Sequence, residues 1–151
     1  MPGSILKQQG FTIVELMVVV TIVSILAVIA IPVYADYATR SKVSEGLAFI
    51  SEAKTAVTEA IYSSGAAPAS NDEAGLPPPE TYDDFEHISR LEVGEEPVPG
   101  TITVTFRIPL LRDDNLLQLV PSIVKGQVTW ECTPAISNGI ATSRIPPNCR
   151  G

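Results

Sequence analysis

The hydrophobic positions of this 151-residue chain fall into three successive patterns. The first is an apolar run without any charged residue over residues 16–35, preceded directly by the acidic Glu15. Twenty helical residues measure about 30 Å, which is the thickness of a bilayer core. The run therefore predicts a membrane-length helix with a carboxylate at its start, where an unpaired charge is costly.

The second pattern is a helical stripe that follows Pro32. Apolar residues recur at spacings of four, three, seven and four, which predicts one buried helix face. These residues are Val43, Leu47, Ile50, Val57 and Ile61. Ser63-Ser64-Gly65 predicts the end of the helix. We expect one helix of about 50 residues, with a first half suited to lipid or like helices and a second half facing a sheet.

The third pattern is the period-two alternation that is typical of strands. It occurs in residues 88–93, 101–108, 117–124 and 127–132. Pro121 interrupts the third segment, which predicts an edge strand or a bulge. Lys125-Gly126 predicts a hairpin turn. The expected fold is therefore α+β, with the long helix packed on a four-stranded antiparallel sheet.

The connection between helix and sheet is acidic and rich in proline. Nine of the 17 acidic residues lie between Asp72 and Glu96. Residues 65–86 predict no regular element, and Pro77-Pro78-Pro79 favours an extended polyproline segment. Carboxylates here could bind calcium, but no EF-hand spacing is present, so a solvated loop or a lateral contact with a neighbouring subunit is the preferred interpretation.

These patterns divide the chain into six segments. They are a leader at 1–10, an apolar helix half at 11–35, an amphipathic half at 36–64, the acidic connection at 65–86, the sheet at 87–132, and a C-terminal region at 133–151.

The charge balance and the cysteines narrow the classes of function. The net charge is −7, and loss of residues 1–10 with Lys7 would make it −8, so nucleic acid is an improbable partner for the isolated subunit. Cys132 and Cys149 bound 18 residues near the C-terminus and indicate a disulfide in an oxidising compartment. Their spacing fits no zinc site, and the single histidine, His87, is distant in sequence.

No catalytic constellation is recognisable in the sequence. His87 has no nucleophile context, and no glycine-rich phosphate loop is present, so we expect no enzyme activity, cofactor or metal. Arg144 lies between the cysteines and Arg150 just outside them. These two arginines are candidates for contact with an anionic ligand or receptor, although an exposed, disulfide-bounded loop packing on the next subunit is the simpler interpretation.

Three interpretations of the N-terminus compete. It is a signal peptide ending at Ala35, a permanent single-span anchor, or a leader cleaved after Gly10 that leaves the apolar helix on the mature chain. Cleavage after Gly10 would create an α-amine at Phe11, about 6 Å along a helix from Glu15. In a bundle of like helices, Glu15 of one chain could then neutralise the amine of the next and favour one register.

Residues 10–17, 29–34 and 36–37 resemble the type IV pilin family, in the form of a type IVa-like major pilin precursor. The resemblance implies that a prepilin peptidase cuts after Gly10 and N-methylates Phe11, and that Glu15 acts in assembly. Pro32 also matches. It removes one backbone donor and predicts a helix kink, and the family melts its helix in this region. Ser24 departs from the glycine that many members have. Residues 130–132 and 145–150 are similar to the disulfide region of the family.

The resemblance implies a structural subunit of a type IV pilus. The precursor would lie in the bacterial inner membrane, meet the assembly machinery there, and join a homo-oligomeric helical filament on the cell surface. Adhesion, twitching motility and DNA uptake would belong to the fibre. The alternatives are a minor pilin or a type II secretion pseudopilin, a DNA-receptor pilin acting through Arg144 and Arg150, and an exported binding protein that begins at Asp36.

Overall fold

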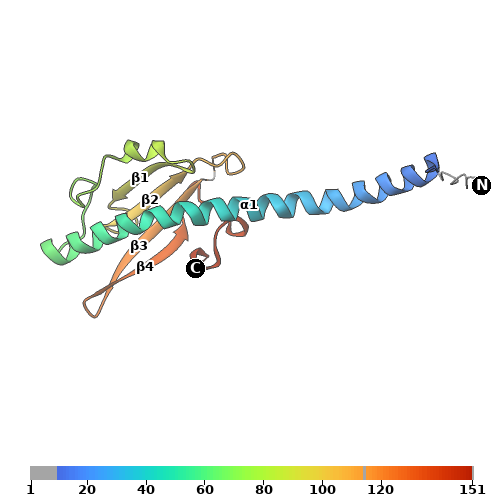
Figure 1. Cartoon of the computed structure of the whole chain (residues 1–151). Coiled ribbons are helices and arrows are strands. Elements are labelled where there is room, and N and C mark those ends of the chain that lie inside the picture. Colours follow the sequence, from blue (N-terminus) through green and yellow to red (C-terminus); the bar gives the residue numbers. More distant parts are fainter. Residues whose placement is uncertain (1–9, 114, 151) are drawn as a thin grey trace, which may run out of the picture. The chain divides into compact units, whose positions relative to one another are not determined.

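In a computed structural model of the protein, the structure describes residues 10–113 and 115–150. The chain divides into two compact units between Ala35 and Asp36. Figure 1 shows the elements of both units. The main elements are α1 (Ile13–Ser64), β1 (Ile88–Gly94), β2 (Thr101–Phe106), β3 (Leu116–Val124) and β4 (Gln127–Pro134). Three short 3₁₀ helices are η1 (Pro79–Asp84), η2 (Thr142–Arg144) and η3 (Pro147–Cys149).

The first unit contains the N-terminal part of α1. Its most apolar 18-residue window has a mean hydropathy of 3.0, and none of that window is buried inside the chain. The helix begins at Ile13 because Thr12 caps it: the Glu15 N–H donates to Thr12 Oγ1 at 3.2 Å. Thr12 and Glu15 form the sequence signature of a capping box, a local start signal. The predicted membrane-length helix is confirmed.

The helix is continuous through Pro32 and ends at Ser64. Pro32 has no N–H, so the Val28 carbonyl lacks its intrahelical donor. At the C-terminal end, Gly65 adopts a φ of 76° and its N–H donates to the Ile61 carbonyl at 3.0 Å. The predicted single helix and its predicted end are both confirmed.

In the second unit, one face of α1 packs on a four-stranded antiparallel sheet with the order β1-β2-β3-β4. The buried helix residues are Thr39, Val43, Gly46, Ile50, Ala53, Val57 and Ile61. Leu47, predicted to lie on this stripe, is only partly buried, and small residues fill the contact instead. At Gly46 a Cβ atom would lie 2.5 Å from Phe106 Cε1, so the close approach requires glycine.

The predicted bulge at Pro121 is wrong, because β3 pairs with β4 through Pro121 without a register shift. The other predicted possibility, an edge position, is confirmed, because β3 pairs with β2 only as far as Leu119. Pro121 lies opposite Trp130, two residues beyond Leu119, the last β3 residue that pairs with β2. In an antiparallel pair, hydrogen-bonded and non-hydrogen-bonded residue pairs alternate, starting from the pair next to the two-residue hairpin. Pro121 and Trp130 therefore form a non-hydrogen-bonded pair, so the backbone nitrogen of Pro121 points away from β4, towards the side where β2 has ended. The strand therefore loses no ladder bond.

The other strand boundaries differ from the prediction by one or two residues: β1 ends at Gly94, β3 begins at Leu116 and β4 ends at Pro134. β2 ends at Phe106 instead of residue 108, because the chain then turns through residues 109–113, where Arg112 has a φ of 48°. Within the acidic connection, η1 forms where no regular element was expected. Pro79 is the first residue of η1, and its fixed φ suits the first helical turn.

Candidate functional site

The predicted cleavage site lies outside the helix. Gly10 and Phe11 precede α1, and Phe11 is 83% exposed. Glu15 is exposed in the first helical turn, and no described residue forms an ion pair with its carboxylate. The helical spacing assumed between Phe11 and Glu15 does not hold in the uncleaved chain, because the Thr12 cap leaves Phe11 outside the helix.

The apolar surface of the first unit is large and continuous along the helix. Every large hydrophobic residue from Phe11 to Tyr34 is at least 51% exposed. A soluble chain rarely exposes an apolar patch of more than a few hundred Å². The surface is therefore suited to lipid, to other helices of its kind, or to each in turn.

The second candidate site is the C-terminal loop, which the predicted disulfide closes. Cys132 of β4 is bonded to Cys149 of η3, and Cys149 is buried. Within the loop, Asn138 has a φ of 56°, a left-handed conformation that asparagine tolerates in turns. Gly139 lies so close to the backbone that a Cβ atom would be 2.1 Å from the Ala135 carbonyl oxygen. Ile140 is buried, so the loop is packed into the core.

Removal of the disulfide should destabilise the second unit. For the pair Cys132→Ser and Cys149→Ser, we expect the free energy of unfolding to fall by about 3 kcal/mol, the chain-entropy value for a loop of this length. Urea unfolding of the full chain in detergent micelles, followed by the fluorescence of the single tryptophan, Trp130, measures this. Dithiothreitol should lower the free energy of unfolding of the parent by a similar amount and should have no effect on the variant. A variant with the same urea midpoint as the untreated parent would contradict the expectation.

The two predicted arginines bond within the chain. Arg144 Nε donates to Asp36 Oδ1 at 2.8 Å, and Arg150 Nη2 donates to the Ile145 carbonyl at 3.3 Å. Arg40 of α1 donates to the Ser143 carbonyl. These contacts tie the C-terminal loop to the start of the second unit. Contact of Arg144 and Arg150 with an external ligand stays a prediction.

The sequence did not identify Asp36 and Arg40 as partners of the C-terminal loop, because their contacts join residues that are distant in sequence. The Asp36–Arg144 pair spans 108 positions and the Arg40–Ser143 bond spans 103. No local spacing signals such a contact. Arg40 Nε is also buried and, among the described residues, has no hydrogen-bond partner.

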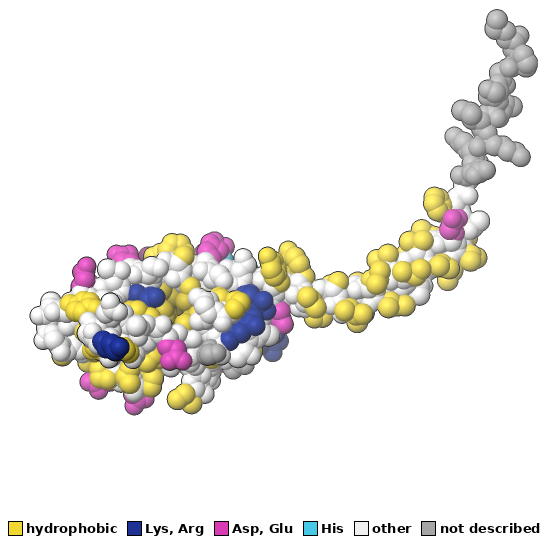
Figure 2. Space-filling view, turned by 90° about the horizontal axis from the view of Figure 1, so that it is seen from below, with side chains coloured by type: hydrophobic (Ala, Val, Ile, Leu, Met, Phe, Trp, Pro, Cys, Tyr) yellow, Lys and Arg dark blue, Asp and Glu magenta, His cyan; other side chains and the backbone are white. Residues whose placement is uncertain are grey.

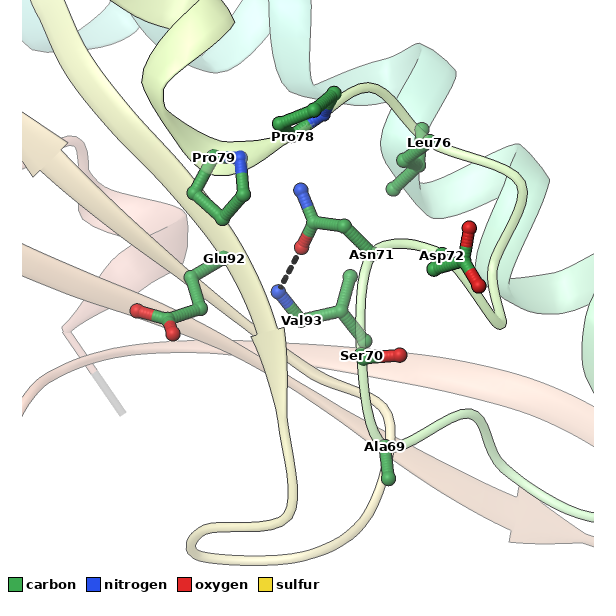
Figure 3. A pocket seen from close by; sticks show the side chains of 9 residues that line it. All are labelled: Ala69, Ser70, Asn71, Asp72, Leu76, Pro78, Pro79, Glu92 and Val93. Atoms are coloured by element: carbon green, nitrogen blue, oxygen red, sulfur yellow. Dashed lines mark hydrogen bonds between the residues drawn. The ribbon is translucent and has the colours of Figure 1, made fainter.

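The acidic connection is fastened to the sheet by the buried side chain of Asn71. Its Nδ2 donates to the carbonyls of Leu91 at 3.0 Å and Pro77 at 2.8 Å, and its Oδ1 accepts from the Val93 N–H at 2.7 Å. Figure 3 shows the bond to Val93. Asn71 therefore occupies the outer edge of β1 in place of a neighbouring strand and shields that edge from pairing.

Carboxylates of the acidic connection and of β1 are paired with Arg90 of β1 and with Arg107, which directly follows β2. Arg90 lies 2.7 Å from Glu80 and 3.2 Å from Glu92, and Arg107 lies 2.8 Å from Asp83. These pairs are exposed to solvent, so each contributes little to stability. Among the residues that the structure describes, no group of three metal-ligating side chains is found.

Aromatic contacts hold the same connection against α1. The rings of Phe49 and Phe85 are 5.2 Å apart, and those of Tyr82 and Phe85 are 5.9 Å apart. Burial, with a smaller contribution from the charge of Glu52, raises the pKa of Tyr82. His87 directly precedes β1, and its Nε2 lies 3.6 Å from Glu45 Oε2 on the helix.

Comparison with known proteins finds similarity across both units. A family model described as Pilin (bacterial filament) matches residues 39–150, and a prokaryotic N-terminal methylation motif matches residues 5–31. The chain is 31% identical to a type IV major pilin protein PilE1 of Neisseria gonorrhoeae, over 95% of this chain and 94% of the relative. It is 32% identical to the fimbrial protein EcpC of Eikenella corrodens, over 95% and 91% of the two chains. A fimbrial protein of Pseudomonas aeruginosa is 52% identical over 54 residues, 36% of this chain and 35% of the relative.

Proposed function

The chain belongs to the type IV pilin family, a structural and not an enzymatic family, and we propose that its mature form is the main subunit of a pilus fibre. The observation that carries the proposal is the apolar part of α1, whose large side chains are all exposed in the single chain. Such a surface needs partners, and identical helices provide them.

The precursor lies in the bacterial inner membrane, with the apolar half of α1 in the lipid. A prepilin peptidase cuts between Gly10 and Phe11 and methylates the new amine of Phe11. That bond is reachable because the Thr12 cap places the helix start beyond it. The processed chain then leaves the membrane through the assembly machinery and joins the fibre at the cell surface.

Glu15 sets the register of assembly. Its carboxylate is unpaired among the described residues and stands at the start of the apolar run. When the helices bundle, a charge surrounded by apolar side chains must find an opposite charge. The amine of Phe11 on a neighbouring chain satisfies this need at one axial stagger, so other registers leave two charges unpaired.

Adhesion and twitching motility are proposed as properties of the fibre and its motors. DNA uptake is the least supported of the fibre functions, because the mature chain carries a charge of about −8, which repels the phosphate backbone. A main subunit is favoured over a minor one by the similarity to major pilins over nearly the whole chain.

The N-terminal mass of the chain in sheared surface filaments tests the proposal. We expect this chain to be the predominant protein, without residues 1–10 and with one added methyl group on Phe11. Intact-mass measurement followed by fragmentation of the N-terminal peptide gives both results. A mature chain that begins at Asp36, or one that is absent from filaments, would overturn the proposal.

A further inference from the structure

Four arginines gather at one end of the second unit, and we refer to them as the arginine cluster. They are Arg40, Arg112, Arg144 and Arg150. Residues 36–151 as a whole carry 9 basic and 16 acidic residues, so their net charge is negative. A positively charged cluster within them is therefore opposite in sign to the rest of the unit. Figure 2 shows lysine and arginine side chains gathered most densely at one end of this unit.

Hydrogen bonds to the backbone connect the members of the cluster. Arg144 Nη1 donates at 3.1 Å to the carbonyl of Leu110, which lies two residues before Arg112. Arg40 donates to the carbonyl of Ser143, next to Arg144. Arg150 donates to the carbonyl of Ile145, on the other side of Arg144. These bonds bring Arg40, Arg144 and Arg150 together from the helix and the C-terminal loop. Arg112 lies in the neighbouring turn after β2, two residues from the Leu110 carbonyl that Arg144 binds.

Two of these guanidinium groups are open to solvent. Arg112 and Arg150 are exposed. Arg112 has no hydrogen bond or ion pair with any residue that the structure describes, and Arg150 uses one donor, for Ile145. A guanidinium has five N–H donors in a planar fork that matches two oxygens of a phosphate. Both side chains therefore have donors available for an external anion.

The acids at this end do not cancel the positive charge. Asp36 pairs with Arg144, and Asp113 follows Arg112 in the chain. Asp114, which lies outside the described residues, adds a third acid in the sequence. Lys42 lies on another face of the helix from Arg40, and Glu45 follows it by one helical turn, so this pair leaves the balance of the cluster unchanged. Four arginines are therefore accompanied by three acidic residues.

Chain connectivity sets the depth of the cluster relative to a membrane. Asp36 directly follows Ala35, the last residue of the apolar run, and Arg40 lies about 6 Å beyond Asp36 along the helix. The Asp36–Arg144 bond joins Arg144 to the residue that directly follows the apolar run in the chain. Tyr34 and Tyr37 are 72% and 67% exposed at this boundary, and tyrosine concentrates at the headgroup level of bilayers.

We propose that the arginine cluster binds the phosphate groups of anionic phospholipids at the outer surface of the inner membrane. This inference rests on the membrane-anchored precursor of the proposed function. Basic groups next to a membrane span attract anionic headgroups, and arginine binds phosphate in a bidentate manner. The contact holds the second unit against the membrane, and the subunit exchanges it for protein contacts when it enters a fibre.

The test uses the full chain in vesicles of phosphatidylcholine with a minor fraction of phosphatidylglycerol. Spin-labelled lipids of each type report, by electron spin resonance, which headgroup is enriched next to the protein. We expect a preference for phosphatidylglycerol that weakens at high salt. The double substitution Arg112→Gln and Arg150→Gln should reduce this preference at least fivefold, since each arginine contributes about that factor near an anionic surface.

The matched control is the pair Lys54→Gln and Lys125→Gln, which removes the same charge elsewhere in the second unit. Lys54 lies about 27 Å along α1 from Asp36, and Lys125 is in the β3–β4 hairpin, where the Tyr62 hydroxyl donates to Gly126. The control should retain the lipid preference. An equal loss in both pairs would show that net charge alone acts and would overturn the proposal.

Two further outcomes would also overturn it. A parent chain that is anchored in the vesicles but shows no headgroup preference refutes the lipid contact alone and leaves the proposed function standing. If the arginine substitutions then reduce cross-linking between chains, the partner of the cluster is an acidic surface of a second copy.

A chain that does not float with the vesicles refutes the anchored precursor, and the inference fails with it. Unfolding curves of all variants, followed by the fluorescence of Trp130, exclude a folding defect.

Discussion

Replacement of Asn71 with alanine should lower the free energy of unfolding by about 3–5 kcal/mol, since a buried group left without its partner costs about 1–3 kcal/mol. The side chain is 5% exposed and makes three hydrogen bonds to the backbone. Alanine would leave the Val93 N–H and the Leu91 carbonyl without partners at the edge of β1. Urea unfolding of the full chain in detergent, followed by the fluorescence of Trp130, gives the difference.

The control for this substitution is Asn148→Ala. Asn148 is exposed in η3, so its removal should change stability by no more than about 0.5 kcal/mol. Because the edge of β1 would be uncovered only in the Asn71 variant, that variant should also aggregate faster. Equal stability of the two variants would show that Asn71 does not hold the acidic connection on the sheet.

The substitution Glu15→Ala should reduce the yield of sheared surface filaments at least tenfold in a strain without other pilins. An unpaired charge in an apolar bundle costs several kcal/mol, and about 1.4 kcal/mol already corresponds to a factor of ten. In the variant, the amine of Phe11 has no carboxylate to meet. Quantification of sheared protein against the total membrane content of the chain measures the effect.

Glu59→Ala is the matched control, because Glu59 is exposed on the same helix within the second unit. It should leave filament yield unchanged. The N-terminal mass of the Glu15 variant separates a failure of cleavage from a failure of assembly. If the correctly processed Glu15 variant forms filaments as well as the parent, Glu15 has no role in register.

Much of the fold could be predicted because its signals are local. The apolar run and the end of the helix at Gly65 depend on neighbouring residues, and so does the Lys125-Gly126 hairpin, whose two residues have φ values of 53° and 80°. Alternating apolar residues likewise predicted four strands in the correct order along the chain. The disulfide followed from the presence of two cysteines in an exported chain.

The parts that could not be predicted depend on tertiary contact. A search for large apolar residues selected Leu47 for the helix stripe, whereas Phe106 requires glycine at position 46. Pro121 argues against a regular strand until one knows that β2 has already ended beside it. The role of Asn71 depends on backbone groups 20 and 22 residues away. In each case the deciding neighbour is distant in sequence.

The bonds of Asp36 and Arg40 to the C-terminal loop have a consequence for the timing of biogenesis. Ribosomes make the N-terminal end first, so the helix can enter the membrane long before Ser143 and Arg144 exist. Neither bond can form, nor can Cys132 reach Cys149, until almost the whole second unit has been synthesised. In the proposed membrane-anchored precursor, the second unit would therefore complete its fold only after translocation, while it is already tethered to the bilayer.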